Sequence, residues 1–336
     1  MKSIFKKGLL TVAAASLVLS SGISQAAGNY ILATASTGGT FYPVGVALAT
    51  LSKVKLQPKH NVGMSAINSA GSGENVKLMR ENEAQFAILQ GLYGSYAWNG
   101  TGPIASAGKQ EYMRSVTMLW QNVEQFVIAS EHAGTGTIMD LAKMNGMKMA
   151  MGKQNSGTIG SNRKILANLG IDMDANFELV HAGYGPSAEA LQDGRVAGVG
   201  IPAGVPTGAI TKLFAAAKGK VTPLKFTPAL AKKADGGLNL WTPYTIKART
   251  YSGQNEDWNT IAQPNFLAVR ADVSEEDVYL LTKTIYENLP FLGAIHKATK
   301  AMSLESSIAG LPAPLHPGAA RYYKEVGLSI PSHLQP

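Results

Sequence analysis

The chain has 336 residues, of which 45% are hydrophobic and 15% are charged, and it contains no cysteine. Disulfides, thiolate metal sites and lipid attachment at a cysteine are therefore excluded. The formal net charge is +8, but the basic residues are scattered along the chain, which argues against nucleic-acid binding.

The N-terminus has the pattern of a secretory signal peptide. A basic start with Lys2, Lys6 and Lys7 precedes an apolar run over residues 8–19, and small residues follow up to Ala26. This order of basic, apolar and small residues is typical of export signals. The apolar run is shorter than the roughly 20 residues that span a bilayer. We therefore expect cleavage near Ala26 and a free, soluble periplasmic protein.

Two strand, loop and helix units follow, one in each half of the chain. In the first, a β-prone run over 30–34 leads into the Gly-rich loop 35–40, and Pro43 suits the first turn of the next helix. In the second, an apolar run ends at Met151, and a helix opens near Ser156 and ends with a glycine cap at Gly170. Each unit predicts a glycine-rich loop at the start of a helix.

A helix, a polar turn and a strand also recur in both halves, over residues 74–90 and 188–199, where the second strand is expected over 195–199. Such alternation predicts mostly parallel sheets covered by helices. The C-terminal third is mainly helical, with a helix that we expect to begin after Ser274 and to stop at Pro290.

The length of the chain predicts two domains. Because no flexible linker separates the halves, we expect strands near 121–129 and 260–268 to cross between the lobes. The sequence thus predicts a two-lobed α/β binding protein of type II, each lobe a mixed, mostly parallel sheet with flanking helices. We expect the signal peptide to cover residues 1–26, lobe I to comprise residues 27–124 and 264–336, and lobe II to comprise residues 125–263.

Signatures of catalysis and of cofactors are weak. There is no G-x-S-x-G nucleophile motif, and the six histidines stand apart from one another without metal-binding spacing. The glycines around Gly198 lack the acidic ribose partner of a dinucleotide site. We therefore expect no enzyme, no metal and no cofactor, and we keep an exported hydrolase or transferase as the alternative.

The two glycine-rich loops are the candidate binding sites. Backbone N–H groups at a helix start lack partners and carry partial positive charge, so such loops hold carboxylates without an arginine. The same residue types also serve as N-caps and tight turns, and the residues alone favour neither interpretation. The candidate residues are Ser36, Thr37, Gly38, Gly39 and Thr40 in lobe I, and Ser156, Gly157 and Thr158 in lobe II.

Several ordered motifs resemble one family over nearly the whole chain after the signal. They are found at 35–45, 71–75, 86–90, 152–158, 190–194, 251–254, 315–319 and 322–325. On these motifs the chain resembles the TAXI class of solute-binding proteins, which serve tripartite ATP-independent periplasmic (TRAP) transporters. One departure is Ala35, where the family commonly has glycine.

The resemblance implies a ligand cleft between two lobes that closes on binding, and delivery of the solute to the integral membrane subunits of a TRAP transporter. It also implies carboxylate ligands such as glutamate or related dicarboxylates. The resemblance adds Gln90 as a polar residue that faces the ligand. It also supports Tyr42, which lies beside the first loop, as a ligand-binding residue. Tyr42 and Trp120 could instead simply pack in the core. We expect a monomer.

Overall fold

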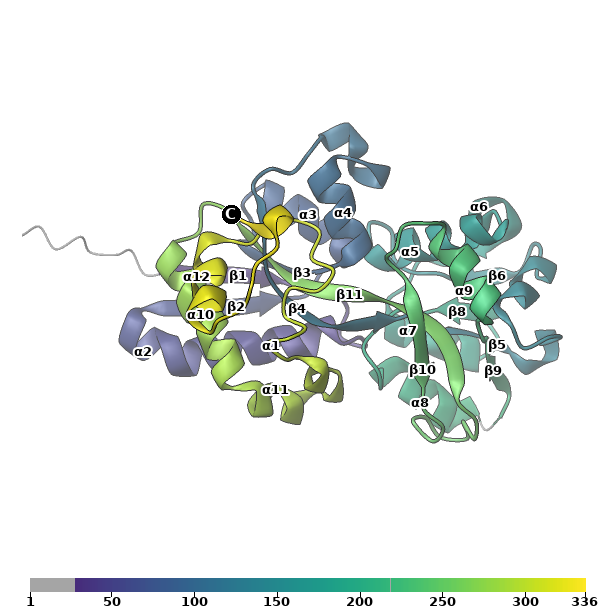
Figure 1. Cartoon of the computed structure of the whole chain (residues 1–336). Helices are drawn as coiled ribbons and strands as arrows, with labels where there is room; N and C mark the ends of the chain where they lie inside the picture. Colours follow the sequence, from purple (N-terminus) through teal and green to yellow (C-terminus); the bar gives the residue numbers. More distant parts are fainter. Residues whose placement is uncertain (1–27, 218) are drawn as a thin grey trace, which may run out of the picture.

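The computed structural model describes residues 28–217 and 219–336, and the signal peptide expected over residues 1–26 lies outside this part of the chain. The described residues form two α/β lobes, which Figure 1 shows side by side. Within these two ranges, no helix combines the length and the apolar character needed to cross a membrane.

Two mixed sheets form the framework. The first has the strand order β10-β11-β3-β1-β2 with β4 paired to β11, and the second has the order β7-β6-β8-β5-β9. Strand β1 is parallel to β2 and β3, and β6 is parallel to β7 and β8, while the other pairs are antiparallel. The strands are β1 Gly28–Ala33, β2 Val62–Ile67, β3 Phe86–Gln90, β4 Met113–Val123, β5 Phe126–Ala129, β6 Lys148–Ala150, β7 Glu178–Leu179, β8 Gly198–Gly200, β9 Val221–Pro223, β10 Thr242–Ile246 and β11 Trp258–Arg270.

Helices flank both sheets (Figure 1). We use lobe I for the elements around β1, β2 and β3, and lobe II for those around the second sheet. The helices are α1 Phe41–Leu51, α2 Gln57–His60, α3 Ser72–Arg80, α4 Gly91–Asn99, α5 Gly157–Leu169, α6 Met173–Asn176, α7 Tyr184–Gln192, α8 Gly208–Ala217, α9 Pro228–Asp235, α10 Glu275–Glu287, α11 Leu289–Ile295 and α12 Pro317–Glu325.

The local signals fix most helix ends. Gly170 caps α5 with a φ of 89°, a left-handed conformation that glycine adopts without strain. The Ser274 hydroxyl accepts the Asp277 N–H at the start of α10. Two expectations were wrong in detail. Helix α10 already ends at Glu287, because Pro290 lies in the first turn of α11, where its missing N–H needs no partner. Of the strand expected over residues 195–199, only residues 198 and 199 belong to β8, because the preceding turn extends to residue 197.

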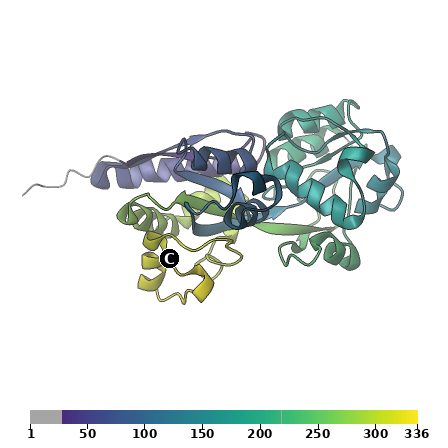
Figure 2. The same ribbon diagram turned by 90° about the horizontal axis from the view of Figure 1, so that it is seen from above.

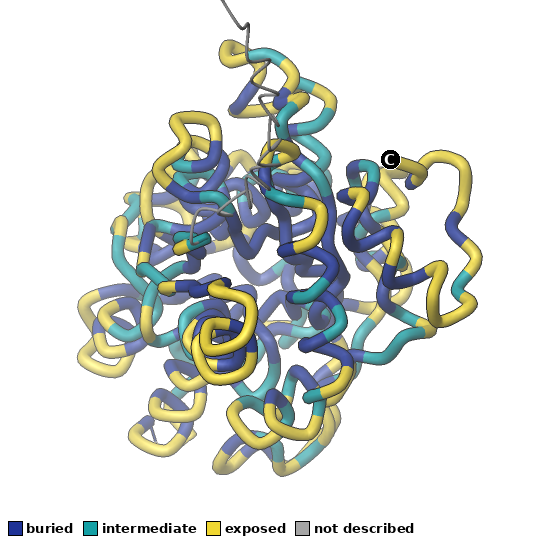
Figure 3. The backbone as a smooth tube through the Cα atoms, turned by 90° about the vertical axis from the view of Figure 1, so that its left-hand side faces the viewer, coloured by how far each residue is buried: buried dark blue, intermediate teal, exposed yellow. Residues whose placement is uncertain are grey.

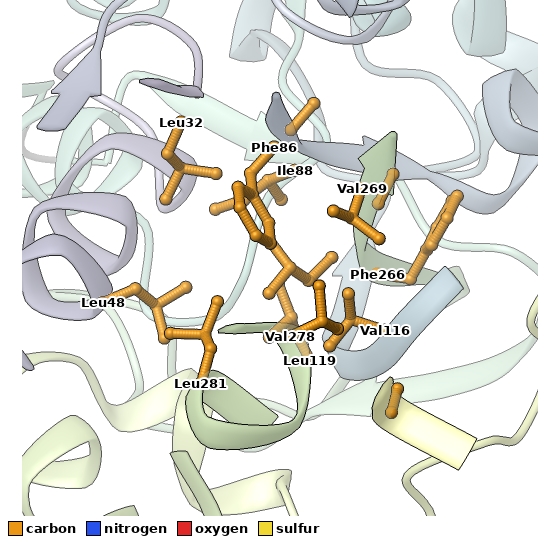
Figure 4. Packing of buried hydrophobic residues seen from close by; sticks show 14 of the residues in the cluster. Leu32, Leu48, Phe86, Ile88, Val116, Leu119, Phe266, Val269, Val278 and Leu281 are labelled. Atoms are coloured by element: carbon orange, nitrogen blue, oxygen red, sulfur yellow. The ribbon is translucent and has the colours of Figure 1, made fainter. Parts of the chain in front are cut away.

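Lobe I has one hydrophobic core between its sheet and its helices (Figure 4). Leu32, Phe86 and Ile88 from the sheet pack against Leu48 of α1 and Leu281 of α10. All are at most 1% exposed. Burial on this scale removes apolar surface from water and fixes the positions of the helix starts that face lobe II.

Lobe II buries both faces of its sheet. On β5, Phe126 and Ile128 join one buried cluster, while Val127 between them joins the other. Successive side chains of a strand point to opposite faces, so the two clusters lie on opposite sides of the sheet. Figure 3, in which lobe I faces the viewer, shows the same division in the molecule as a whole, with buried segments in the interior and exposed ones outside.

Strands β4 and β11 connect the lobes. They pair over most of their length and run from the lobe I sheet toward lobe II (Figures 1 and 2). Phe266 packs in the lobe I core, whereas Trp258 and Val123 belong to a lobe II cluster. The expected crossing strands are thus confirmed. The lobe boundaries drawn at 124/125 and 263/264 stay a prediction.

Candidate ligand-binding site

A small cavity lies between the lobes, and the centre of a water-sized probe can occupy about 30 Å³ of it. Ligand sites usually have volumes of roughly 300–1,000 Å³, so a solute larger than a few water molecules would enter only when the lobes move apart. Lobe I and lobe II both contribute to its wall. The lining residues are Ala35, Ser36, Gly39, Thr40, Phe41, Ala70, Gly71, Ser72, Gln90, Asn122, Gly157, Thr158, Tyr184, Pro202 and Ala203.

Several helices begin at the cavity. The first residues of α1, α3, α5 and α7, which are Phe41, Ser72, Gly157 and Tyr184, line it, as does the N-cap Gln90 of α4. The first N–H groups of a helix have no partner within it, and the helix dipole adds partial positive charge there. The wall therefore presents N–H donors and positive potential to the cavity from both lobes.

Charged side chains are absent from the lining among the described residues. Among these lining residues, Tyr184 alone has an acidic or basic side chain, and burial raises the pKa of its hydroxyl. In the described ranges there is also no group of three or more His, Cys, Asp or Glu side chains that could hold a metal ion. An anion in this cavity would be held by dipoles and neutral donors.

The first candidate loop lies only partly on the cavity. Ser36, Gly39 and Thr40 line it. Thr37 is exposed, and Thr37 and Gly38 border a separate surface pocket together with Lys212 of α8. No side-chain cap closes the start of α1, so its first N–H groups stay available to a ligand.

The second candidate loop divides differently. Gly157 and Thr158 line the cavity, but Ser156 is the N-cap of α5. Its hydroxyl accepts the Ile159 N–H at 3.1 Å and donates to the Lys153 carbonyl at 2.7 Å. The capping interpretation is thus confirmed for Ser156, because both functions of its hydroxyl are engaged within the lobe.

Thr158 is also engaged by a neighbour. Its hydroxyl lies 2.7 Å from the Tyr184 hydroxyl, which donates to the Pro202 carbonyl at 2.6 Å. Because Tyr184 has only one proton, Thr158 is the donor in their shared bond. The Thr158 hydroxyl therefore keeps only acceptor capacity toward the cavity, and Thr158, Tyr184 and Pro202 form a connected edge in lobe II.

The remaining candidates differ in position. Gln90 ends β3 and lines the cavity, whereas Tyr42 is half-buried on α1 outside the lining. Trp120 is 1% exposed and packs edge-to-face on Phe41, with ring centroids 6.0 Å apart. It therefore supports the cavity wall from beneath.

The cleft between the lobes is closed. The Thr40 hydroxyl donates to the Gly204 carbonyl at 3.1 Å, and the Ala209 N–H donates to the Gly38 carbonyl at 3.2 Å. On the other side of the cavity, the Glu74 N–H donates to the Asn155 carbonyl at 2.9 Å. These bonds join residues of lobe I to residues of lobe II around the cavity.

The hinge strands form a polar floor. On β4, Asn122 lines the cavity, and Glu124 follows directly after the last residue of this strand, Val123. The Glu124 carboxylate accepts from Trp241 Nε1 at 2.9 Å and from Gln263 Nε2 at 3.2 Å. Complete burial raises the pKa of Glu124 to about 7, and these two hydrogen bonds only partly offset that rise.

Sequence reasoning missed several lining residues. Ser72 and Tyr184 each begin a helix after a glycine, which is a weaker form of the signal that identified the two loops. Asn122 has no local signal, because its position on the cavity depends on how β4 pairs with a distant strand. Pro202 and Ala203 enter the lining from the segment after β8.

Solved structures share the fold. MatC from Rhodopseudomonas palustris with bound malate has a TM-score of 0.56 at 14% identity, covering 89% of this chain and 98% of that one. A protein of Bordetella bronchiseptica RB50 has a TM-score of 0.53 at 14% identity, covering 90% and 85%. A binding protein component of an ABC phosphonate transporter from Pseudomonas aeruginosa has a TM-score of 0.51 at 9% identity, covering 80% and 78%.

These likenesses establish the architecture of the chain, which is the type II fold of periplasmic solute-binding proteins, with two mixed sheets and flanking helices. The sequence itself matches the NMT1-like family over residues 32–327, which is most of its length. The chain therefore belongs to the NMT1-like family.

Proposed function

We propose that the protein is a periplasmic receptor that captures a small carboxylate solute between its lobes and delivers it to a TRAP-type membrane transporter. The observation that carries the proposal is the convergence of helix starts from both lobes on one neutral cavity. Helix N-termini are ready-made anion sites, and contributions from both lobes link binding to closure.

The solute class follows from the lining. Backbone N–H groups and hydroxyls can surround a carboxylate, while the absence of lysine or arginine from the described lining disfavours highly charged anions. The cavity is narrow in this closed arrangement, with about 30 Å³ open to the centre of a water-sized probe, and this favours a small organic acid over a large solute. Glutamate and related dicarboxylates are the first candidates, and the malate in MatC lies in a protein of the same fold.

Location and partner rest on the sequence. The expected signal peptide places the protein in the periplasm, and the TAXI-like motifs favour TRAP-type membrane subunits as the partner. As a monomer in the periplasm, the protein would reach these subunits by diffusion.

A receptor fits the cavity better than an exported hydrolase or transferase. Such an enzyme needs a nucleophile beside a base, or an acid and base pair. Tyr184 is the one ordinary titratable side chain among the described lining residues, and its raised pKa keeps it protonated at neutral pH. The hydroxyls of Ser156 and Thr158 bond to a carbonyl and to a tyrosine rather than to a base.

Thermal unfolding tests the proposal. The protein is unfolded, dialysed and refolded to remove any solute that copurifies, and its Tm is measured with a panel of amino acids and organic acids. A ligand that binds only the folded state at a hundredfold excess over its Kd should raise the Tm by about 5 °C. Sugars and neutral amides of similar size serve as controls. A panel in which no carboxylate moves the Tm contradicts the carboxylate assignment.

A further inference from the structure

Three amide side chains lie together on the floor of the cleft. Gln90 on β3 stands directly opposite Asn265 on β11, and Asn265 stands directly opposite Trp120 on β4. Directly opposite residues of antiparallel strands share one face, and Asn122, two residues beyond Trp120, shares it too. We call Gln90, Asn122 and Asn265 the amide cluster.

The amide cluster is buried but lacks hydrogen-bond partners. Gln90, Asn122 and Asn265 are 3%, 1% and 0% exposed. Among the described residues, no partner reaches the Gln90 Oε1 atom or either side-chain polar atom of Asn122 and Asn265. Buried polar side chains are nearly always hydrogen-bonded in folded proteins, so a cluster of this kind calls for a functional explanation.

The cluster adjoins the cavity. Gln90 and Asn122 are part of the lining, and the strand register places Asn265 between the strands that carry them. Farther along the same face, Gln263 is fully paired, since its Oε1 accepts the Leu92 N–H and its Nε2 donates to Glu124. The unpartnered amides therefore coincide with the part of the floor that meets the cavity.

The chemistry of the three amides defines what they can bind. Together they present three carbonyl oxygens and three NH2 groups, and rotating an amide exchanges its oxygen and nitrogen without changing these numbers. The NH2 groups can donate to a carboxylate. The oxygens need donors, and in this arrangement none of the three amides donates to the oxygen of another. A carboxylate with an unsubstituted carbon chain supplies only acceptors at neutral pH, so it would leave the oxygens unpaired.

We propose that the amide cluster selects the solute, by accepting hydrogen bonds from a hydroxyl or amino group on the carbon chain of the carboxylate. This inference rests on the proposed function, since it assumes that the helix starts hold the carboxylate itself. It assigns Asn122 and Asn265 as specificity-determining residues beside Gln90. Sites built to pair with a hydroxyl or amino group reject analogues that lack it, because their own polar groups are then left unpaired.

Matched ligand sets test the selection. Calorimetry on the refolded protein compares glutarate with glutamate and 2-hydroxyglutarate, and succinate with aspartate and malate. We expect the better-bound length to favour a substituted acid over its unsubstituted parent by roughly 100-fold or more. The amino and hydroxy members of each set show which donor the cluster prefers.

Variants connect the selection to the cluster. Asn265→Leu should reduce the ratio between substituted and parent acid at least tenfold, and Asn259→Leu is the matched control, because Asn259 lies exposed on the same strand. If Asn265→Leu does not fold, Asn122→Leu takes its place, and the ratio in the unmodified protein remains decisive. Equal affinity for parent and substituted acids overturns the selection but leaves the proposed function intact, whereas binding of no carboxylate overturns both.

Discussion

The wall and the floor of the cleft are built on different principles. The wall consists of helix starts, and its backbone N–H groups can donate hydrogen bonds to any carboxylate. The floor consists of side chains on β3 and on the crossing strands β4 and β11, with the amide cluster at the cavity and Glu124 just beyond the end of β4. The wall is suited to holding an anion, and the floor is suited to distinguishing one solute from another.

The two regions also differ in what closure does to them. The wall is divided between the lobes, so it is complete only when the loops around Thr40 and Gly157 approach each other. The floor lies on strands that belong to the hinge, and its register is fixed by their pairing. Affinity should therefore respond to wall changes that affect closure, while floor changes should alter selectivity and pH dependence.

The largest expected effect belongs to Glu124 on the floor. Its pKa is about 7 in the folded protein and near 4.5 when unfolded. Between these values the folded state holds a proton that the unfolded state has lost, so the free energy of unfolding decreases as the pH rises from about 4.5 to about 7. The contribution is roughly 3 kcal/mol. Urea unfolding at several pH values should show this decrease in the free energy of unfolding of the protein minus that of Glu124→Gln, since the subtraction removes the contributions of the other titrating groups.

The neighbours of Glu124 do not produce the same signal. Tyr184 keeps its proton across this range, because burial raises the pKa of its hydroxyl. Glu256→Gln is a suitable control, since the Lys225 ion pair lowers the pKa of the exposed Glu256 carboxyl and keeps its titration below the window. Parallel pH profiles for the protein and Glu124→Gln would show that Glu124 is not the group that titrates.

The wall could be predicted from sequence largely because its signals are local. A run of Gly, Ser and Thr between a strand and a helix identifies a helix start, and both predicted loops reach the cavity. The residues could not separate a ligand contact from a cap. Ser156 and Ser36 looked equivalent, yet Ser156 closes its own helix while Ser36 lines the cavity.

The floor could not be predicted for a physical reason. Crossing strands were expected, but the contribution of Asn122 and Asn265 depends on the register between β4 and β11, and a one-residue shift would turn either side chain away from the cleft. An irregularity between Asn265 and Phe266 changes that register within the pair. No local pattern records such a shift. The raised pKa of Glu124 likewise follows from burial in the assembled hinge.

A smaller effect is expected where the two lobes meet at the wall. A Cβ atom on Gly157 would lie 2.2 Å from Gln90 Oε1 and 2.9 Å from Ser72 Oγ. Gly157→Ala should therefore oppose closure. Because the atoms in the way are side-chain ends that can turn aside, we expect solute affinity to fall by roughly tenfold. Calorimetry measures the affinity, and urea unfolding checks that the lobe itself is intact.

Gly185→Ala is the matched control for this change. A Cβ atom at Gly185, also at a helix start near the cleft, meets nothing within 4 Å. Its affinity should match that of the unmodified protein. If Gly157→Ala binds equally well, the two lobes do not approach at this point in the bound state, and the wall is then formed mainly by lobe I.

The smallest expected effect concerns the Thr40 hydroxyl, which joins the two lobes beside the cavity. Thr40→Val removes the bond to the Gly204 carbonyl, which still accepts from the Thr207 hydroxyl at 3.0 Å, so no carbonyl is left unpaired. A net loss of about 1 kcal/mol corresponds to roughly fivefold weaker binding in a titration. Thr50→Val is the control, because Thr50 bonds within the exposed face of the same helix. A loss well beyond tenfold would instead place the Thr40 hydroxyl on the solute, and the wall would then select as well as hold.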